Sequence, residues 1–205
     1  ALLDAGLMHA DAKTCFGNGF GDFCQEPTLI DGQIEWRSAT ATSLDPEILT
    51  TPAKPFAPNG GVKLLEGNLG RSVIKTSAVQ EQHHIVEAPA VVIDDQDDLK
   101  PLFEAGELDK DCVVVVRFQG PAANGMPELH KLTPMLGVLQ DRGHKVALVT
   151  DGRMSGASGK VPAAIHLVPE ASQGGQLAKI QTGDVIRLDA TTGELSAQVD
   201  ETELK

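Results

Sequence analysis

Two short apolar runs, at residues 112–118 and 146–150, constrain the fold of this chain more than any other feature. The first reads CVVVVRF and the second VALVT, so apolar and β-branched residues follow one another without polar alternation. A run of this length and composition is typical of a buried strand. Because the first run is apolar on both faces, it predicts a strand at the centre of a sheet.

Each run is followed by a break and then by a loop of small residues. The sequence QGPAANGMPEL comes after residue 118, and DGRMSGASGKV comes after residue 150. Loops of this kind leave the backbone accessible, and α/β sheets place their ligands at the ends of strands. We therefore expect the two loops to meet at one rim of the sheet and to form a site there.

The rest of the chain predicts a structure in which strands outnumber helices. Strands are expected at residues 62–65, 72–76, 90–93, 178–180 and 184–188, and helices at about 95–105 and 128–139. Helices set between short strands favour a mixed or barrel-like sheet over a regular doubly wound fold. The predicted fold class is α/β, rich in strands, with a barrel-like sheet and flanking helices.

The beginning of the chain has a different character. Residues 1–8, ALLDAGLM, are apolar at helical spacing but lack a cap, which predicts the last turns of a helix that starts earlier in a longer polypeptide. A processed terminus is the alternative. Residues 9–60 show little periodicity and are interpreted as a connector with a turn at Asp31 and Gly32. The expected division is a preceding domain's end plus connector at 1–55, and a second domain at 56–205.

Composition excludes several classes of protein. The net charge of −12 argues against nucleic-acid binding, because a binding groove has to neutralise phosphates. No apolar run approaches the length of a membrane span. The three cysteines have no framework spacing, which favours reduced thiols and a cytoplasmic setting.

Three familiar functional motifs can be excluded from the sequence. The glycine-rich segment at 15–21 has neither a strand before it nor a helix after it, so it is not a dinucleotide fingerprint. Val161 stands where a P-loop needs Ser or Thr. Arg153 and Ala157 flank Ser155 where a hydrolase elbow needs two glycines, so Ser155 lacks the setting of an acyl-transfer nucleophile.

Each candidate site residue has two possible interpretations, one functional and one structural. As a general base, Ser155 would need a nearby metal to lower its pKa, and otherwise Ser155 and Ser158 hydrogen-bond the turn. Glu128, near the start of a predicted helix, is either a ligand for a hard metal ion or a simple first-turn acid. His166 lies in an apolar run, which favours a core histidine over a catalyst.

Three segments resemble the dihydroxyacid and phosphogluconate dehydratase family. They are GPAANGMPELHKLTP at 120–134, TDGRMSGASGKVPAAIHLVPEA at 150–171, and GGVKLLEGNLG at 60–70 with SVIKTSAV at 72–79. The sequences of the first two segments are similar to those of the family's phosphogluconate branch. The opening LLDAGLMHAD resembles the end of the family's large amino-terminal domain.

This resemblance implies a fold and a reaction. The fold is a swivelling β/β/α domain, and the reaction is that of a hydro-lyase which converts 6-phospho-D-gluconate to 2-dehydro-3-deoxy-6-phosphogluconate and water, in the Entner–Doudoroff pathway. By motif position, Ser155 matches the serine that becomes an alkoxide and takes the C2 proton, and Glu128 matches a magnesium ligand. An iron–sulfur cluster, expected to be 4Fe–4S, would act as Lewis acid on the C3 hydroxyl.

The neighbours of Ser155 are candidates for substrate binding. Gly156 and Ser158 belong to the same loop, and the cations of Arg153 and Lys160 are expected to hold a carboxylate or a phosphate. The three cysteines, Cys15, Cys24 and Cys112, fall outside the family's cluster motifs. The cluster is therefore expected in the amino-terminal domain, and this chain alone is expected to be inactive.

The expected partners are a small sugar-acid phosphate and the protein's own amino-terminal domain, in a full-length homodimer without nucleic acid or membrane. Two alternatives stay open. One is a non-catalytic swivelling domain that supplies an interaction surface only. The other is a dehydratase for another sugar acid or for a dihydroxy acid.

Overall fold

The computed structural model describes residues 1–155 and 159–200. Clustering of contacts separates two compact units, Ala1–Pro58 and Asn59–Lys205, which are described in turn.

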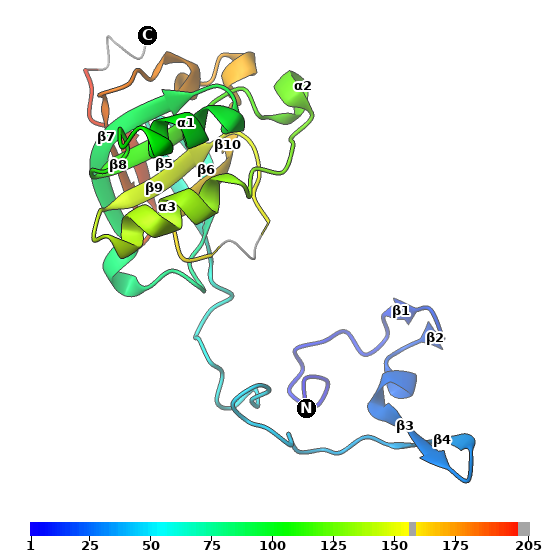
Figure 1. The fold of residues 1–205 in the computed structure, drawn as a ribbon. Coiled ribbons are helices and arrows are strands. Elements are labelled where there is room, and N and C mark those ends of the chain that lie inside the picture. The colour runs from blue at the N-terminus through cyan, green and yellow to red at the C-terminus, as the bar shows by residue number, and fades with distance from the viewer. Residues whose placement is uncertain (156–158, 201–205) are drawn as a thin grey trace. The chain divides into compact units, whose positions relative to one another are not determined.

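The first unit contains short hairpins and no core. Its elements are β1 (Lys13–Thr14), β2 (Gly17–Asn18), the 3-10 helix η1 (Gly21–Cys24), β3 (Gln25–Ile30) and β4 (Gln33–Ser38). No residue of Ala1–Pro58, all of which the structure describes, is buried. In Figure 1 this unit is the blue and light-blue part of the ribbon.

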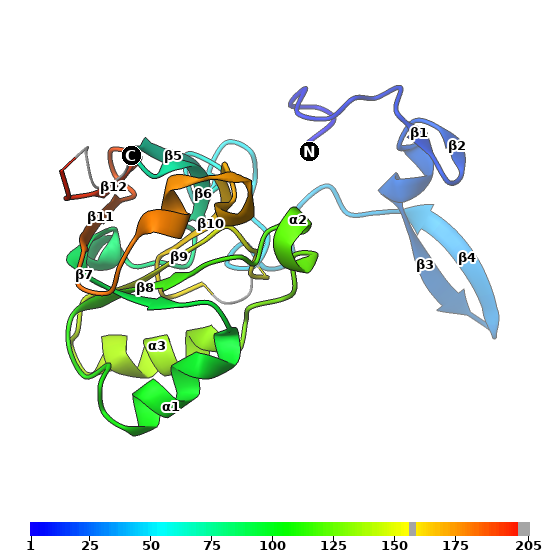
Figure 2. The ribbon, with the colours of Figure 1, turned by 90° about the horizontal axis from the view of Figure 1, so that it is seen from above.

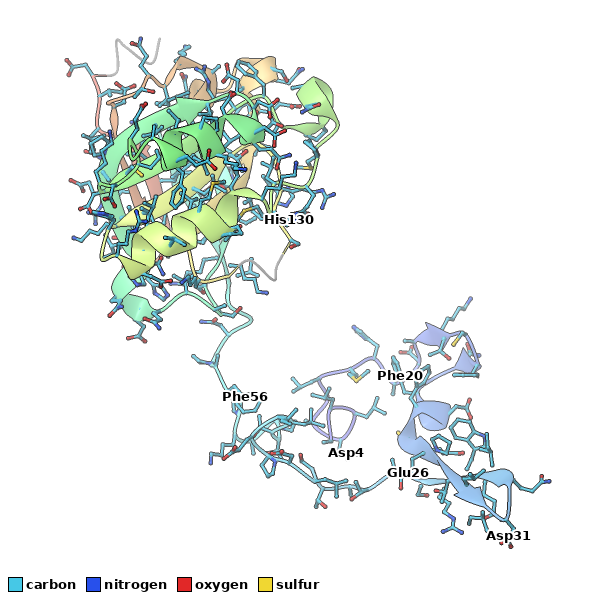
Figure 3. The ribbon with its side chains drawn as sticks, in the orientation of Figure 1. Asp4, Phe20, Glu26, Asp31, Phe56 and His130 are labelled. Carbon is cyan, nitrogen blue, oxygen red and sulfur yellow. The ribbon has the colours of Figure 1, made fainter. Side chains whose placement is uncertain are left out.

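The turn predicted at Asp31 and Gly32 is confirmed, because it joins β3 to β4 at the tip labelled Asp31 in Figure 3. Both residues are left-handed, with φ of 49° and 79°, as a tight hairpin turn requires. Residues 1–8, predicted as the last turns of a helix, form turns in which Ala5 N donates to Ala1 O at 2.9 Å, as in a helical turn, and Gly6 with φ of 69° follows in a left-handed conformation. That this helix begins earlier in a longer polypeptide stays a prediction.

The second unit is a closed barrel. Among the described residues, eight strands join in the order β10-β6-β5-β12-β11-β7-β8-β9 and back to β10. The strands are β5 (Val62–Gly67), β6 (Gly70–Lys75), β7 (Ile85–Ile93), β8 (Cys112–Val116), β9 (Val146–Thr150), β10 (Ala163–Val168), β11 (Val185–Asp189) and β12 (Glu194–Ala197). The parallel arc runs through β7, β8, β9 and β10, and β5 also pairs with β12 in parallel.

Helices cover the parallel arc on its outside. The covering helices are α1 (Leu99–Glu104) and α3 (Leu132–Asp141), whereas α2 (Pro121–Asn124) lies at the edge of the barrel beside the 3-10 turn η4 (Ala171–Gln173). The other 3-10 turns are η2 (Glu81–His83), η3 (Gln96–Asp98) and η5 (Gln176–Lys179). Figure 2 shows α1 and α3 side by side along one face of β7, β8 and β9. Among the described residues, no helix combines the length and apolar character that crossing a bilayer requires.

The two apolar runs of the sequence account for two layers of core. Along β8, Val113 and Val115 point into the barrel, whereas Cys112, Val114 and Val116 pack under the helices. β9 alternates in the same way. Because each strand has apolar contacts on both faces, β8 has no polar position, and in β9 only the last residue, Thr150, is polar. The predicted mixed, strand-rich, barrel-like fold with flanking helices is therefore confirmed.

Two local predictions differ from the structure. Residues 178–180, predicted as a strand, lie at the end of η5, which is held by backbone bonds such as Ala178 N to Gly175 O. Strand β12 was not predicted; it pairs with β11 and closes the barrel against β5.

Candidate functional site

The loops after β8 and β9 do meet at one rim of the barrel. The two strands are parallel neighbours in a register that sets Val116 opposite Thr150, so both chains leave the sheet at the same edge. Cross-loop hydrogen bonds then begin at once, with Gln119 N donating to Asp151 Oδ1 at 2.9 Å. The expected juxtaposition of the two small-residue loops follows from this register.

Asp151 joins three segments of this rim. It is fully buried, and its second oxygen, Oδ2, accepts a hydrogen bond from Ala171 N at 2.9 Å. A buried carboxylate is tolerated only when its oxygens are hydrogen-bonded, which ties the β8 loop, the β9 loop and η4 together. The sequence interpretation treated Asp151 as a turn residue only. Its position directly after a buried strand was the available signal for this role.

The loop around α2 is fixed by two further polar side chains. Gln119 is 4% exposed; its Nε2 donates to Asp94 O at 2.7 Å, and its Oε1 accepts from Asn124 Nδ2 at 3.0 Å. The Glu170 carboxylate accepts from Ala122 N at 3.2 Å. A Cβ on Gly120 would overlap that carboxylate, so any larger residue would have to displace it from Ala122 N.

Glu128 does not lie on a helix, contrary to the sequence prediction. Helix α3 begins at Leu132, and Glu128 instead forms an isolated parallel bridge with Arg153. The physical reason is a contact distant in sequence, together with the left-handed Met126 (φ 59°), which redirects the chain before the helix. Glu128 is therefore not a first-turn acid of α3.

The Glu128 carboxylate connects Arg153 to Ser155. Its Oε2 lies 2.6 Å from Arg153 Nη1, and its Oε1 accepts a hydrogen bond from Ser155 N at 2.7 Å. Arg153 also donates from Nε to Met126 O at 3.0 Å. The structure thus brings together three of the residues singled out in the sequence.

Ser155 is exposed at the rim and lines two cavities. One, of about 260 Å³, is bounded mainly by apolar side chains and by Lys75 and His166. The other, of about 700 Å³, is bounded by His130, Thr133 and Lys160 among others. A group at Ser155 therefore faces two cavities, one bounded mainly by apolar side chains and the other by a mixture of apolar, polar and charged groups that includes the Lys160–Asp141 pair.

The second predicted cation, Lys160, is paired with an acid. Its Nζ lies 2.6 Å from both oxygens of Asp141, and its stem packs against Gly137 of α3. The remaining candidates, Gly156 and Ser158, lie outside the described residues. The structure therefore carries Ser155, Arg153, Lys160 and Glu128 to one rim, with an anionic partner on each of the two cations.

The sequence favoured a core position for His166, and this prediction is wrong. His166 is exposed, with φ of 56°, at an irregularity of β10 between Ile165 and Val168. A bulge re-aims the side chain, here toward the rim cavities. Phe118 and Met126 share this left-handed conformation, and within the described part of the barrel unit these three are the non-glycine residues with positive φ. Strain of this kind gathers at functional sites.

The described residues do not by themselves form a site for either group that the resemblance implies. They contain no group of three or more His, Cys, Asp or Glu side chains placed to hold a metal ion. Cys15 and Cys24 are exposed in the first unit, whereas burial raises the pKa of the Cys112 thiol to about 11. Glu128 is a suitable ligand type for magnesium, but both of its oxygens already have partners.

Comparison with known proteins adds independent information. The family model "Dihydroxy-acid/6-phosphogluconate dehydratase C-terminal" matches residues 47–205. Proteins named phosphogluconate dehydratase are 58% identical over 99% of the chain in Escherichia coli K12 and 59% identical over 98% in Pseudomonas aeruginosa. A dihydroxy-acid dehydratase of Ignicoccus hospitalis is 36% identical.

The chain spans about a third of the length of these relatives, 34%, 33% and 35% respectively. Their similarity nevertheless extends over nearly all of the chain, including both rim loops. The chain therefore belongs to the dihydroxy-acid/6-phosphogluconate dehydratase family, and its barrel is that family's carboxyl-terminal domain.

Proposed function

We propose that this chain is the carboxyl-terminal part of a hydro-lyase that converts 6-phospho-D-gluconate to 2-dehydro-3-deoxy-6-phosphogluconate and water, with Ser155 as the base. The observation that carries the proposal is the position of Ser155, exposed between two cavities with its backbone amide bonded to Glu128. The names of the relatives at 58% and 59% identity support the substrate class.

The role assigned to Ser155 is proton transfer. Its deprotonated Oγ takes the proton from C2 as the C2–H bond breaks, and the electron pair left at C2 forms a double bond to C3 as the C3–O bond breaks. The leaving hydroxide is protonated to water, and Ser155 gives up the proton it has taken, so that protons balance over one cycle. The resulting enol tautomerises to the 2-keto acid. A serine hydroxyl is a weak acid in water, so the site has to favour its charged form. Arg153 and Lys160 are the cations of the same rim, although each is shared with a carboxylate.

The implied iron–sulfur cluster and magnesium ion are assigned to the rest of the polypeptide. The described residues offer one carboxylate, Glu128, that could complete a magnesium site formed largely elsewhere. Residues 1–55 are proposed to continue a large preceding domain, residues 56–205 to form the domain that covers the substrate, and the full-length protein to be a cytoplasmic homodimer.

A second substrate class has one observation in its favour. The relative at 36% identity is named a dihydroxy-acid dehydratase, and it too matches the whole chain. The lower identity makes this the weaker candidate. The two classes differ at the far end of the substrate, which carries a phosphate in one and an alkyl group in the other.

The test uses the longest native polypeptide that contains this chain, purified without oxygen. It is offered 6-phosphogluconate, unphosphorylated gluconate and a dihydroxy acid, and formation of 2-keto acid is followed. We expect activity on 6-phosphogluconate, and a loss of at least about 100-fold in kcat for Ser155→Ala with KM changed little. Ser172→Ala, at an exposed serine of η4, is the control.

Two results would contradict the proposal. Full activity of Ser155→Ala would exclude Ser155 as the base. If a protein with an intact cluster formed no 2-keto acid from 6-phosphogluconate but did turn over the dihydroxy acid, the second substrate class would be the correct one.

A further inference from the structure

The hydrogen-bond partners of the Glu128 carboxylate suggest a positioning role in addition to the metal-ligand role proposed above. One oxygen accepts from the Arg153 guanidinium at 2.6 Å, and the other accepts from the backbone amide of Ser155 at 2.7 Å. The guanidinium itself is held at a second point by its Nε bond to Met126 O, 3.0 Å away. The carboxylate is therefore clamped on one side and acts on Ser155 with the other.

The backbone just before Ser155 is anchored by main-chain bonds. Leu129 N donates to Arg153 O at 3.2 Å, and His166 N donates to Gly152 O at 2.9 Å. At Ser155 itself, the backbone amide donates to the Glu128 carboxylate at 2.7 Å. The position of the Ser155 main chain therefore depends in part on where the Glu128 carboxylate lies.

We propose that Arg153 is a positioning residue, which holds the Glu128 carboxylate so that its other oxygen fixes the amide of Ser155. The proposal rests on the proposed function, in which Ser155 is the base. A base displaced by about 1 Å loses on the order of 100-fold in rate, so a clamp on its backbone has a measurable effect on kcat. Arg153 acts through Glu128 and is not assigned a contact with substrate.

The exposure of the pair separates this role from a contribution to folding. The side chains of Arg153 and Glu128 are 45% and 26% exposed. Ion pairs with such access to solvent contribute little to global stability. Removing the guanidinium should therefore disturb the position of Ser155 and leave the barrel folded.

The chain offers a matched control for this experiment. Arg71 of β6 pairs with Glu66 of β5, with Nε 3.0 Å from Oε1 and side chains 66% and 59% exposed. It is also an exposed Arg–Glu pair between neighbouring strands, but it has no bond to either rim loop among the described residues. Arg71→Met therefore measures how the loss of an exposed Arg–Glu pair away from the rim affects the same readouts.

The first readout needs no cofactor and uses the present chain. Amide hydrogen exchange at Ser155 is measured by NMR in the wild type, Arg153→Met, Arg153→Lys and Arg71→Met. We expect faster exchange at Ser155 in Arg153→Met, partial recovery in Arg153→Lys, and no change in Arg71→Met. Unchanged exchange in Arg153→Met would overturn the proposal.

The second readout uses the full-length enzyme. Arg153→Met is expected to lower kcat by about 10- to 100-fold with KM changed less than about threefold, and Arg153→Lys to recover part of the loss. A rise in KM at constant kcat would instead make Arg153 a substrate-binding residue and overturn the proposal. Ser155→Ala is assayed in parallel. If it abolishes turnover while Arg153→Met is fully active, the positioning role fails and the function stands; if Ser155→Ala is active, the proposed function fails.

Discussion

The two units of this chain use the same local structure and reach opposite results. Both contain antiparallel hairpins with regular registers, β3 with β4 in the first and β5 with β6 in the second. The first unit has no buried residue over Ala1–Pro58, whereas the second encloses a core inside the barrel and another beneath α1 and α3. Turn chemistry and alternation are therefore sufficient for a hairpin, but closure of the sheet is what creates a core.

The β3–β4 hairpin shows what is missing. Its register places Leu29 opposite Ile34 and Pro27 opposite Trp36, so these four apolar residues share one face. Leu29, Ile34 and Trp36 are 73%, 66% and 63% exposed. A two-stranded hairpin is marginal in water without a layer packed against it. The barrel strands escape this limit because each apolar face has a second layer.

The largest effect expected from this contrast is the loss of stability when a carboxylate is introduced into one strand of each unit. Val114→Asp places a charge in the fully buried middle of β8, under the helices, and should cost about 4 kcal/mol or more of unfolding free energy. Leu29→Asp, on the exposed face of β3, should change it by less than about 0.5 kcal/mol. Urea unfolding followed by far-UV circular dichroism measures both.

Fluorescence provides the internal control for that experiment. The chain has one tryptophan, Trp36, which lies in the first unit. Its emission should indicate solvent exposure already in the native chain and should change little through the barrel's transition. Equal losses for Leu29→Asp and Val114→Asp would show that the first unit has a core of its own, and the comparison would fail.

A smaller effect is expected from adding one methyl group to a glycine of each unit. At Gly67 the new Cβ would overlap the backbone of Leu195, where β5 meets β12 and the barrel closes. Gly21, in η1, has nothing within 4 Å of the corresponding position. We expect Gly67→Ala to cost about 2–3 kcal/mol and Gly21→Ala to change stability by less than about 0.5 kcal/mol, both by urea unfolding. A tolerated Gly67→Ala would mean that the β5–β12 seam is loose.

The parts of the fold that local sequence determines were predictable. The valine run of β8 has no polar position, and only a strand with two apolar faces explains it; the Asp31–Gly32 turn needs left-handed residues that aspartate and glycine supply. The position of Glu128 was not predictable in this way. Its partner Arg153 is 25 residues away, and the left-handed Met126 between strand and helix is a conformation that no local preference of methionine favours.

The same distinction applies to the site. That two glycine-rich loops follow two buried strands was visible in the sequence, and it located the rim correctly once the strands proved to be parallel neighbours. The bulge that turns His166 outward depends on pairing with β6, and the clamp formed by Asp151 depends on Ala171 of a different loop. Contacts of this kind come from closure of the barrel, which periodicity along one segment does not encode.

The smallest effect expected concerns the thiols, which report the same contrast through pH. Burial raises the pKa of Cys112 to about 11 from the ordinary 9.0, whereas Cys15 and Cys24 are exposed. Between pH 9 and 11 the native state keeps the Cys112 proton that the unfolded chain releases, so this contribution is complete below pH 9 and falls as pH rises, by about 1.4 kcal/mol per unit. We expect the unfolding free energy of the wild type to fall relative to that of Cys112→Ala by this slope. The absence of tyrosine removes the other side chain that titrates near pH 10 apart from lysine, which is common to both proteins. If wild type and Cys112→Ala had the same pH dependence, the first residue of β8 would be open to solvent. The two units would then differ less than their burial indicates.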